Sequence, residues 1–91
     1  MIKYNEDEAI VPLSKLKDWH FNLEGIEKKF QFKNFTEALG FIVKVGVISE
    51  KMNHHPELFN VYNKVNIRLS THDANGVTDK DFKLASEIDQ L

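Results

Sequence analysis

The chain contains no cysteine among its 91 residues. It therefore cannot form a disulfide framework, a thiolate nucleophile, a zinc finger or an iron–sulfur site, because each of these depends on cysteine sulfur. Small secreted domains usually depend on disulfides, so their absence fits a reducing compartment. We expect a cytoplasmic protein.

Arginine is nearly absent, and positive charge is not concentrated anywhere. Arg68 is the only arginine, and 12 basic residues stand against 14 acidic ones, which gives a formal charge of -2. Proteins that bind nucleic acids usually carry a basic stripe that neutralises phosphates. Direct binding to nucleic acid is therefore disfavoured.

Apolar residues do not form a run long enough to span a membrane. The most apolar stretch, residues 39–48, is interrupted by Lys44, whereas a spanning helix needs about 20 consecutive apolar residues. Residues 1–10 carry acidic side chains where a secretory signal has a basic start and an apolar stretch. We expect neither a membrane segment nor a secretory signal.

What is present is the composition of an ordinary globular protein. Hydrophobic residues make up 42% and charged residues 29% of the chain, and this apolar content is enough to offset the entropy cost of folding. The two prolines, Pro12 and Pro56, stand between patterned segments, and no linker-like stretch occurs. We predict one domain over residues 1–91. A core of this size gives modest stability, so self-association would help it.

Helical patterns occur in three places. A long helix over residues 35–52 is predicted because Asn34 can cap its first turn and apolar residues recur at helical spacing. Thr78 and Asp81 have the spacing of a capping box and predict the start of a last helix. Residues 10–18 predict a short first helix with a proline in its first turn.

Two pairs of short strands are predicted around the long helix. Residues 19–23 and 26–32 are rich in aromatics and are expected to form a hairpin that turns at residues 24–25. Residues 65–70 alternate apolar and polar side chains, and residues 59–62 are the expected partner strand. This order predicts an α+β fold, with a four-stranded antiparallel sheet and helices packed on one face.

Three of the four histidines follow the ends of predicted elements. His54 and His55 come just after the long helix, and His72 follows the strand of residues 65–70. Loops at such positions bring side chains together on a rigid scaffold, and histidine changes charge near neutral pH. We interpret these three histidines as a shared functional pocket. His20 lies among aromatics on a hairpin strand and is interpreted as a packing or surface residue.

Two other kinds of site use similar residues. A zinc site is disfavoured because adjacent histidines rarely direct both rings at one ion, and no HExxH motif or cysteine pair accompanies them. A covalent nucleophile at Ser70 or Thr71 is disfavoured because no GxSxG turn is present. Both remain alternative interpretations of the same residues.

Several segments carry a resemblance to a known family. They are residues 50–57, EKMNHHPE; residues 59–65, FNVYNKV; residues 69–73, LSTHD; and residues 78–85, TDKDFKLA. With Asp18-Trp19 and residues 30–38, FQFKNFTEA, they make the chain closely resemble the pterin-4a-carbinolamine dehydratases over residues 16–91. The resemblance implies a four-stranded antiparallel sheet with three helices on one side.

The resemblance also implies a set of site residues. The catalytic residues would be His54, His55 and His72. The pterin pocket would be lined by Asn53, His54, His55, Ser70, Thr71, His72 and Asp73. Asp81 matches a family acid that would orient a histidine or only cap a helix, and Glu50 and Trp19 would be further supporting residues. Leu58 stands where many members carry Trp, and Asn53 where many carry Asp, which concerns the rim of the pocket.

The activity that the resemblance implies is the removal of water from a 4a-hydroxytetrahydropterin to give a quinonoid dihydropterin, in tetrahydropterin recycling. Histidine, whose ordinary pKa is about 6.5, can supply both the acid and the base, so no metal and no cofactor are expected. The expected partners are the pterin substrate and further copies of the chain, in a homodimer or homotetramer. An aromatic amino acid hydroxylase would be the metabolic neighbour.

A second function also occurs in this family. Some members bind a transcription factor as a dimerisation cofactor, so the alternative is a protein-binding module on the same fold. Such a module needs an exposed apolar helix face for a partner helix, whereas an enzyme needs only the intact histidine pocket.

Overall fold

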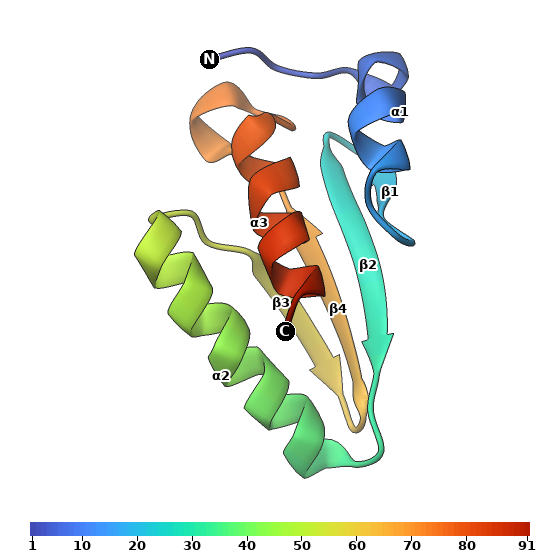
Figure 1. Ribbon diagram of the computed structural model, residues 1–91, viewed down its shortest axis with the longest axis vertical. Coiled ribbons are helices and arrows are strands. Elements are labelled where there is room, and N and C mark those ends of the chain that lie inside the picture. The colour runs from blue at the N-terminus through green and yellow to red at the C-terminus, as the bar shows by residue number, and fades with distance from the viewer.

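A computed structural model of the chain describes all of residues 1–91. Its elements are α1 (Glu6–Ser14), β1 (His20–Asn22), β2 (Gly25–Gln31), α2 (Phe35–Met52), β3 (Glu57–Val61), β4 (Lys64–Leu69), the 3₁₀ turn η1 (His72–Ala74) and α3 (Asp79–Asp89). Figure 1 shows α2 and α3 lying across the sheet, with α1 next to β1. None of these helices is both long and apolar enough to cross a membrane.

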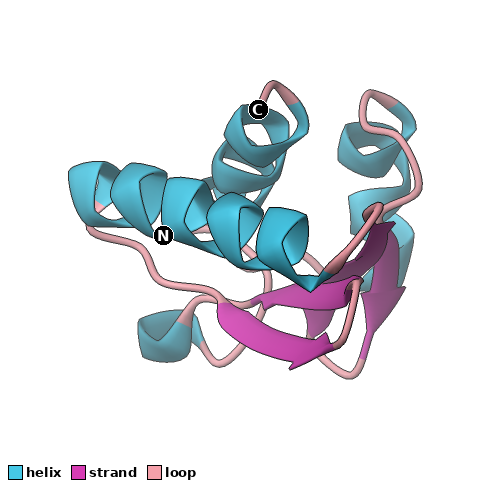
Figure 2. Cartoon of the chain, turned by 90° about the horizontal axis from the view of Figure 1, so that it is seen from below, coloured by secondary structure: helices cyan, strands magenta, loops and turns pink.

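The four strands form one antiparallel sheet in the order β1-β2-β4-β3. The three α-helices lie on one side of this sheet (Figure 2). The α+β fold predicted from the sequence is therefore confirmed, with its four-stranded sheet and three helices.

Strand β4 shows why one face of the sheet is covered. Val65, Ile67 and Leu69 are fully buried, whereas Asn66 and Arg68 between them are partly exposed. Alternate side chains of a strand point to opposite faces, so the three apolar residues face the helices. The buried apolar core consists of Trp19, Ile26, Ala38, Val45, Val65, Ile67, Leu69, Val77, Leu84, Ala85 and Ile88.

The β1–β2 turn lies one residue earlier than predicted. Leu23 and Glu24 occupy the two turn positions with positive φ angles of 48° and 62°, where residues other than glycine are strained. The Arg68 guanidinium donates hydrogen bonds to the carbonyls of Asn22 and Leu23. A Cβ atom at Gly25 would lie 2.5 Å from that guanidinium. A side chain at position 25 would therefore make the end of the Arg68 side chain shift.

The predicted boundaries of the first helix were wrong. Helix α1 begins at Glu6 because the side chain of Asn5 accepts a bond from the backbone N–H of Glu8, and the Glu8 carboxylate accepts one from the backbone N–H of Asn5. Pro12 lies near the end of the helix, not in its first turn. Proline has no N–H for the Glu8 carbonyl, so the turn before it lacks one helical bond. The helix ends two residues after Pro12, at Ser14.

The two other helices begin where the sequence predicts. The Asn34 side chain accepts from the backbone N–H of Glu37 at the start of α2, and α2 covers the predicted residues 35–52. Thr78 and Asp81 form the capping box of α3. Both helix starts are fixed by side chains within three residues of the cap, which is why the local pattern locates them.

Candidate active site

The predicted histidines lie at one end of the sheet. Glu57 at the start of β3 pairs with Arg68 near the end of β4, so the loop before β3 and the loop after β4 leave the sheet together. Helix α2 ends there and α3 begins there (Figure 1). His54, His55 and His72 therefore belong to loops on the same end of the fold.

The end of α2 directs His54 toward α3. Asn53 has a left-handed backbone (φ 50°, ψ 43°), its N–H donates to the carbonyl of Glu50, and the N–H of His54 donates to the carbonyl of Ser49. This pair of bonds is the Schellman motif, which reverses the chain at the end of a helix. Asparagine tolerates the left-handed conformation better than most residues. Asn53, predicted to line the pocket, thus has a structural role in aiming the next residue.

His54 and Asp81 form a buried pair across 27 residues of sequence. The His54 Nε2 atom lies 2.6 Å from Asp81 Oδ1, and the Asp81 side chain is fully buried. The other carboxylate oxygen of Asp81 accepts from the Thr71 hydroxyl at 2.8 Å and from the Thr78 backbone N–H at 2.9 Å. Asp81 was expected to orient a histidine or only to cap a helix. Its carboxylate both contacts His54 and caps α3.

Asp81 determines which nitrogen of His54 is open. An ionised carboxylate only accepts hydrogen bonds, so Nε2 carries a proton and donates it to Asp81. Nδ1 then holds the lone pair in the neutral ring, and it makes no hydrogen bond within the chain. No buried side-chain nitrogen or oxygen lacks a partner, so Nδ1 must be accessible to solvent. A buried aspartate behind an imidazole whose other nitrogen is open is the arrangement that supports proton transfer.

His55 faces away from this buried pair. Its Nε2 atom lies 2.5 Å from Glu50 Oε2, and both side chains are mostly exposed, at 58% and 78%. An ion pair this exposed adds little to stability. Glu50, predicted to be a supporting residue, therefore partners His55 and not His54.

The loop that carries His72 is closed at its base. The backbones of Thr71 and Gly76 form a β-bridge, and the Ala74 N–H donates to the Thr71 carbonyl. His72 and Asp73 are exposed in this loop, and their side chains make no hydrogen bond or ion pair within the chain. Both are free to contact a small molecule.

Two further predicted residues are held within the fold. The Ser70 hydroxyl donates to the carbonyl of Glu24 in the β1–β2 turn at 2.8 Å. Trp19 is buried in the core, and its indole N–H donates to Asp89 Oδ2 at 3.0 Å. Asp89 lies eight residues beyond Asp81 on α3, or about 12 Å along the helix at about 1.5 Å per residue. Trp19 thus bonds to the other end of α3.

Sequence reasoning missed the residues that surround His54. A pocket of about 280 Å³ is lined by Met52, His54, Lys80, Lys83 and Glu87. The last three lie on α3 at spacings of three and four residues, which places them on one face of the helix. That spacing was visible in the sequence, but it did not reveal that the face adjoins the end of α2.

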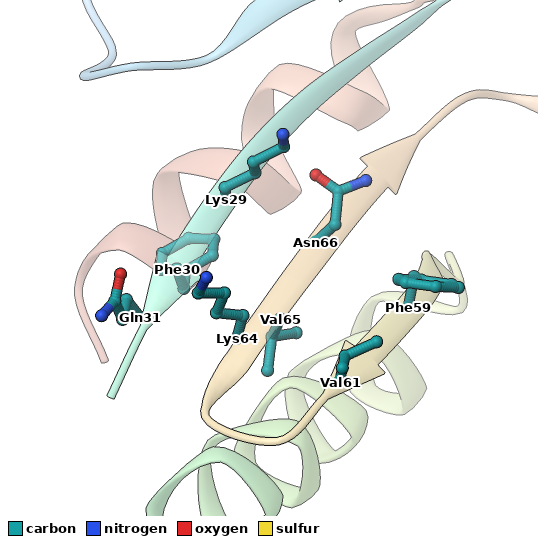
Figure 3. Close-up of a pocket in the computed structure, with 8 residues that line it drawn as sticks. All are labelled: Lys29, Phe30, Gln31, Phe59, Val61, Lys64, Val65 and Asn66. Carbon is teal, nitrogen blue, oxygen red and sulfur yellow. The ribbon is translucent and has the colours of Figure 1, made fainter. Parts of the chain in front are cut away.

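A larger hollow of about 480 Å³ lies elsewhere, on the strands β2, β3 and β4 (Figure 3). It is lined by Lys29, Phe30, Gln31, Phe59, Val61, Lys64, Val65 and Asn66. No histidine and no carboxylate lines it, so it offers no group that exchanges protons readily near neutral pH. Of these two pockets, the smaller one beside His54 is the better candidate for a reaction site.

Two groups with displaced pKa values lie outside the predicted site. The hydrogen bond that the Tyr4 hydroxyl donates to Asp79 raises the pKa of Tyr4 above its ordinary value of 10.0. A hydrogen bond from the Asn22 amide lowers the pKa of Glu27, although partial burial opposes the shift. No three His, Asp or Glu side chains are grouped so that they could hold a metal ion.

Comparison with known proteins gives a consistent result. A family model described as pterin 4 alpha carbinolamine dehydratase matches residues 2–91. Two similar proteins, from Sinorhizobium fredii and Prochlorococcus marinus, carry the name pterin-4-alpha-carbinolamine dehydratase provisionally. The first is 51% identical over 86 residues, which cover 91% of this chain and 82% of that protein. The second is 45% identical over 91 residues, which cover 100% of this chain and 94% of that protein.

Solved structures add two relatives. A crystal structure from Brucella melitensis, described as a transcriptional coactivator/pterin dehydratase, matches with a TM-score of 0.92 and 38% identity, over 98% of this chain and 97% of that one. A pterin dehydratase-like protein described as a RuBisCO assembly factor in the alpha-carboxysome matches with a TM-score of 0.65 and 19% identity, over 79% and 83%. The second likeness concerns the fold alone.

Proposed function

Because this chain belongs to the pterin 4 alpha carbinolamine dehydratase family, we propose that it removes water from a 4a-hydroxytetrahydropterin to give a quinonoid dihydropterin. The observation that carries the proposal is the buried His54–Asp81 pair, whose 2.6 Å bond leaves one ring nitrogen open. A dehydration of this kind needs a group that can give or take one proton beside the substrate.

The reaction is balanced by two proton transfers. An acid protonates the 4a hydroxyl, and the C4a–O bond breaks as water leaves. The lone pair of the adjacent ring nitrogen forms the C=N bond, and a base takes the proton from the ring. Histidine serves both steps because its ordinary pKa of about 6.5 is close to neutral pH.

The three histidines differ in surroundings, and we assign their roles accordingly. His54 exchanges a proton through Nδ1 while Asp81 holds its other nitrogen. His72 exchanges the second proton from its exposed loop at the same end of the sheet. His55, held by Glu50, binds or positions the pterin.

The first experiment measures the decay of enzymatically generated 4a-hydroxytetrahydropterin by absorbance, in buffer with a chelator. Wild-type protein is compared with His54→Asn, His72→Ala and the control His20→Ala. We expect each site variant to lose about 10² to 10⁴-fold in kcat. His20 is exposed on β1 and should change nothing. Circular dichroism checks that each variant is folded. No acceleration by the folded wild type would refute the proposal.

The expected surroundings of this activity follow from the family. The quinonoid product would return to a tetrahydropterin cycle that serves an aromatic amino acid hydroxylase. That link and the cytoplasmic location expected from the sequence stay predictions.

Helix α2 supports a homo-oligomer. Phe35, Leu39, Val43 and Val47 are exposed by 46%, 43%, 66% and 53%, and we call these four residues the α2 apolar face. They stand four residues apart and span about 18 Å at about 1.5 Å per residue. Such a continuous ridge fits the groove of an identical helix that crosses at about 50°. A second copy of this chain is therefore the proposed occupant.

Charge also favours a second copy in the antiparallel sense. Helix α2 has Glu37 in its first turn and Lys51 in its last turn. In an antiparallel pair the helix dipoles would be opposed favourably, and Lys51, which continues the four-residue spacing of the α2 apolar face, would lie at the rim of the contact. The alternative, a helix of another protein on the same face, is the binding-module function considered for the sequence.

The oligomer is tested by light scattering during gel filtration. Wild type should have the mass of a dimer or larger, and Val43→Lys should shift it toward monomer because a charge enters the α2 apolar face. Val11→Lys is the matched control, since Val11 is equally exposed, at 65%, but lies on α1. Monomeric wild type would refute self-association and leave the face open to another protein.

A further inference from the structure

Two threonines lie buried behind the His54–Asp81 pair. Thr71 and Thr78 are exposed by 3% and 1%, although Thr71 was predicted to line the pterin pocket. Their hydroxyl oxygens lie 2.6 Å apart, and neither side chain is free to reach a substrate. A buried hydroxyl pair needs its hydrogen bonds satisfied within the fold. These bonds show what the two residues do.

The bonds run in one direction. Thr71 has one hydroxyl proton, which goes to Asp81 Oδ2 at 2.8 Å. The proton between the two hydroxyls must therefore come from Thr78, whose oxygen in turn accepts from the Lys80 backbone N–H at 3.3 Å. Each hydroxyl in the row is polarised toward the carboxylate. The row ends on one oxygen of Asp81.

The second carboxylate oxygen is left for His54 alone. Asp81 Oδ2 takes the Thr71 hydroxyl and the Thr78 backbone N–H, and Oδ1 takes the His54 ring. Fixing Oδ2 prevents rotation of the carboxylate and so fixes the direction of Oδ1. We infer that Thr71 and Thr78 are positioning residues that hold Asp81 so that His54 keeps its proton on Nε2 and its open nitrogen at Nδ1. This inference rests on the proposed function of His54 in proton transfer.

Helix capping does not explain Thr71. Thr78 would be needed as the cap of α3 in any case, because it accepts from Lys80 and pairs with Asp81 in the capping box. Thr71 lies seven residues earlier, after β4, and takes no part in the helix. Valine has nearly the same shape but has no hydroxyl to donate to the carboxylate. The Thr71 hydroxyl is accounted for by its hydrogen bond to the Asp81 carboxylate.

The test replaces Thr71 by valine, which keeps the shape and removes the hydroxyl, and by serine, which keeps the hydroxyl. Ser49→Ala is the control, because Ser49 is another buried hydroxyl near the end of α2 and bonds only the Val45 carbonyl. Ring ¹⁵N shifts from two-dimensional NMR report the His54 tautomer at the alkaline end of a titration. Steady-state kinetics report kcat and KM.

We expect wild type and Thr71→Ser to show the Nε2–H tautomer, and Thr71→Val to show a mixture of tautomers. Losing a hydrogen bond to a charged group should lower kcat about ten-fold or more in Thr71→Val. KM should stay within two-fold, Thr71→Ser should stay near wild type, and Ser49→Ala should change stability only. A purely structural role would lower stability without moving the tautomer.

Two results would overturn the inference. One is a Thr71→Val protein with the wild-type tautomer and a kcat within two-fold of wild type. The other is a wild-type spectrum that shows the proton on Nδ1, which decides against it even if the valine variant does not fold. The NMR readout needs no pterin, so an inactive wild type would refute the proposed function alone, whatever the tautomer.

Discussion

Replacing Asp81 by asparagine should reverse the His54 tautomer without changing the shape of the site. The Thr71 hydroxyl and the Thr78 N–H both donate to one side-chain oxygen, so the amide oxygen must take that place. The amide NH₂ group then faces His54 Nε2 across the 2.6 Å contact. An NH₂ group donates and cannot accept, so Nε2 must become the acceptor. The single proton of the neutral ring moves to Nδ1.

The cost of this reversal follows from its effect on Nδ1. Nδ1, which makes no hydrogen bond within the chain, would lose its lone pair and could no longer take a proton. General acid–base catalysis contributes about 10² to 10⁴-fold, or about 3 to 5.5 kcal/mol, and kcat should fall within that range. The bonds to the oxygen become neutral and weaker, so unfolding free energy should fall by about 1 to 3 kcal/mol.

The assay combines pterin turnover, the ring ¹⁵N shifts of His54 and urea unfolding. Asp89→Asn is the matched control, because Asp89 is another aspartate of α3 that accepts hydrogen bonds, from Trp19 and Lys28. The control should lose stability and keep kcat. A folded Asp81→Asn protein with kcat within three-fold of wild type, or with the proton still on Nε2, would refute the reasoning.

Three further predictions concern stability and can be followed by urea unfolding. Gly25→Ala should lower the unfolding free energy by about 0.5 to 1.5 kcal/mol, because a Cβ 2.5 Å from the Arg68 guanidinium would shift it and weaken its bonds to the carbonyls. Gly46→Ala, whose Cβ would meet nothing, should be neutral or stabilising, and equal effects would contradict the account. The pKa of Tyr4 is raised in the folded protein, so its bond to Asp79 contributes fully below about pH 10 and is lost as pH rises through the folded pKa. The stability difference between wild type and Tyr4→Phe should therefore shrink in alkali. A difference that stays constant would argue against this role of the Tyr4 bond. The pKa of Glu27 is lowered in the folded protein, so its contribution to stability is present above its ordinary pKa of 4.5 and is lost as pH falls through the folded pKa. The greater stability of wild type over Glu27→Gln should therefore disappear in acid. A stability difference that persists in acid would be contrary evidence.

The strand register shows what short-range pattern can predict. The alternation of residues 65–70 identifies a half-buried strand, and the covered face of β4 follows from it. The β1–β2 turn was displaced by one residue because its support comes from Arg68, which is distant in sequence. Glycine at position 25 suggested a turn residue, but it lies just after the turn, beside the Arg68 guanidinium.

In the candidate site, too, the residues could be named from the sequence but their contacts could not. Sequence and resemblance named three histidines and Asp81, and their assignment as site residues stays a prediction. They did not indicate that His54 is buried against Asp81 while His55 is exposed beside Glu50. Adjacent residues differ in this way because the left-handed turn at Asn53 directs only the first of them toward α3.

The sequence by itself determined the helix starts at Asn34 and Thr78, the order of strands and helices, and the fold class, because caps and periodicity depend on residues only a few positions apart. The tertiary structure alone decided which side chains meet. The His54–Asp81 pair joins residues 27 positions apart, and Trp19 bonds Asp89 across 70 positions. Such contacts depend on how α2, α3 and the sheet pack together, and no local pattern contains that information.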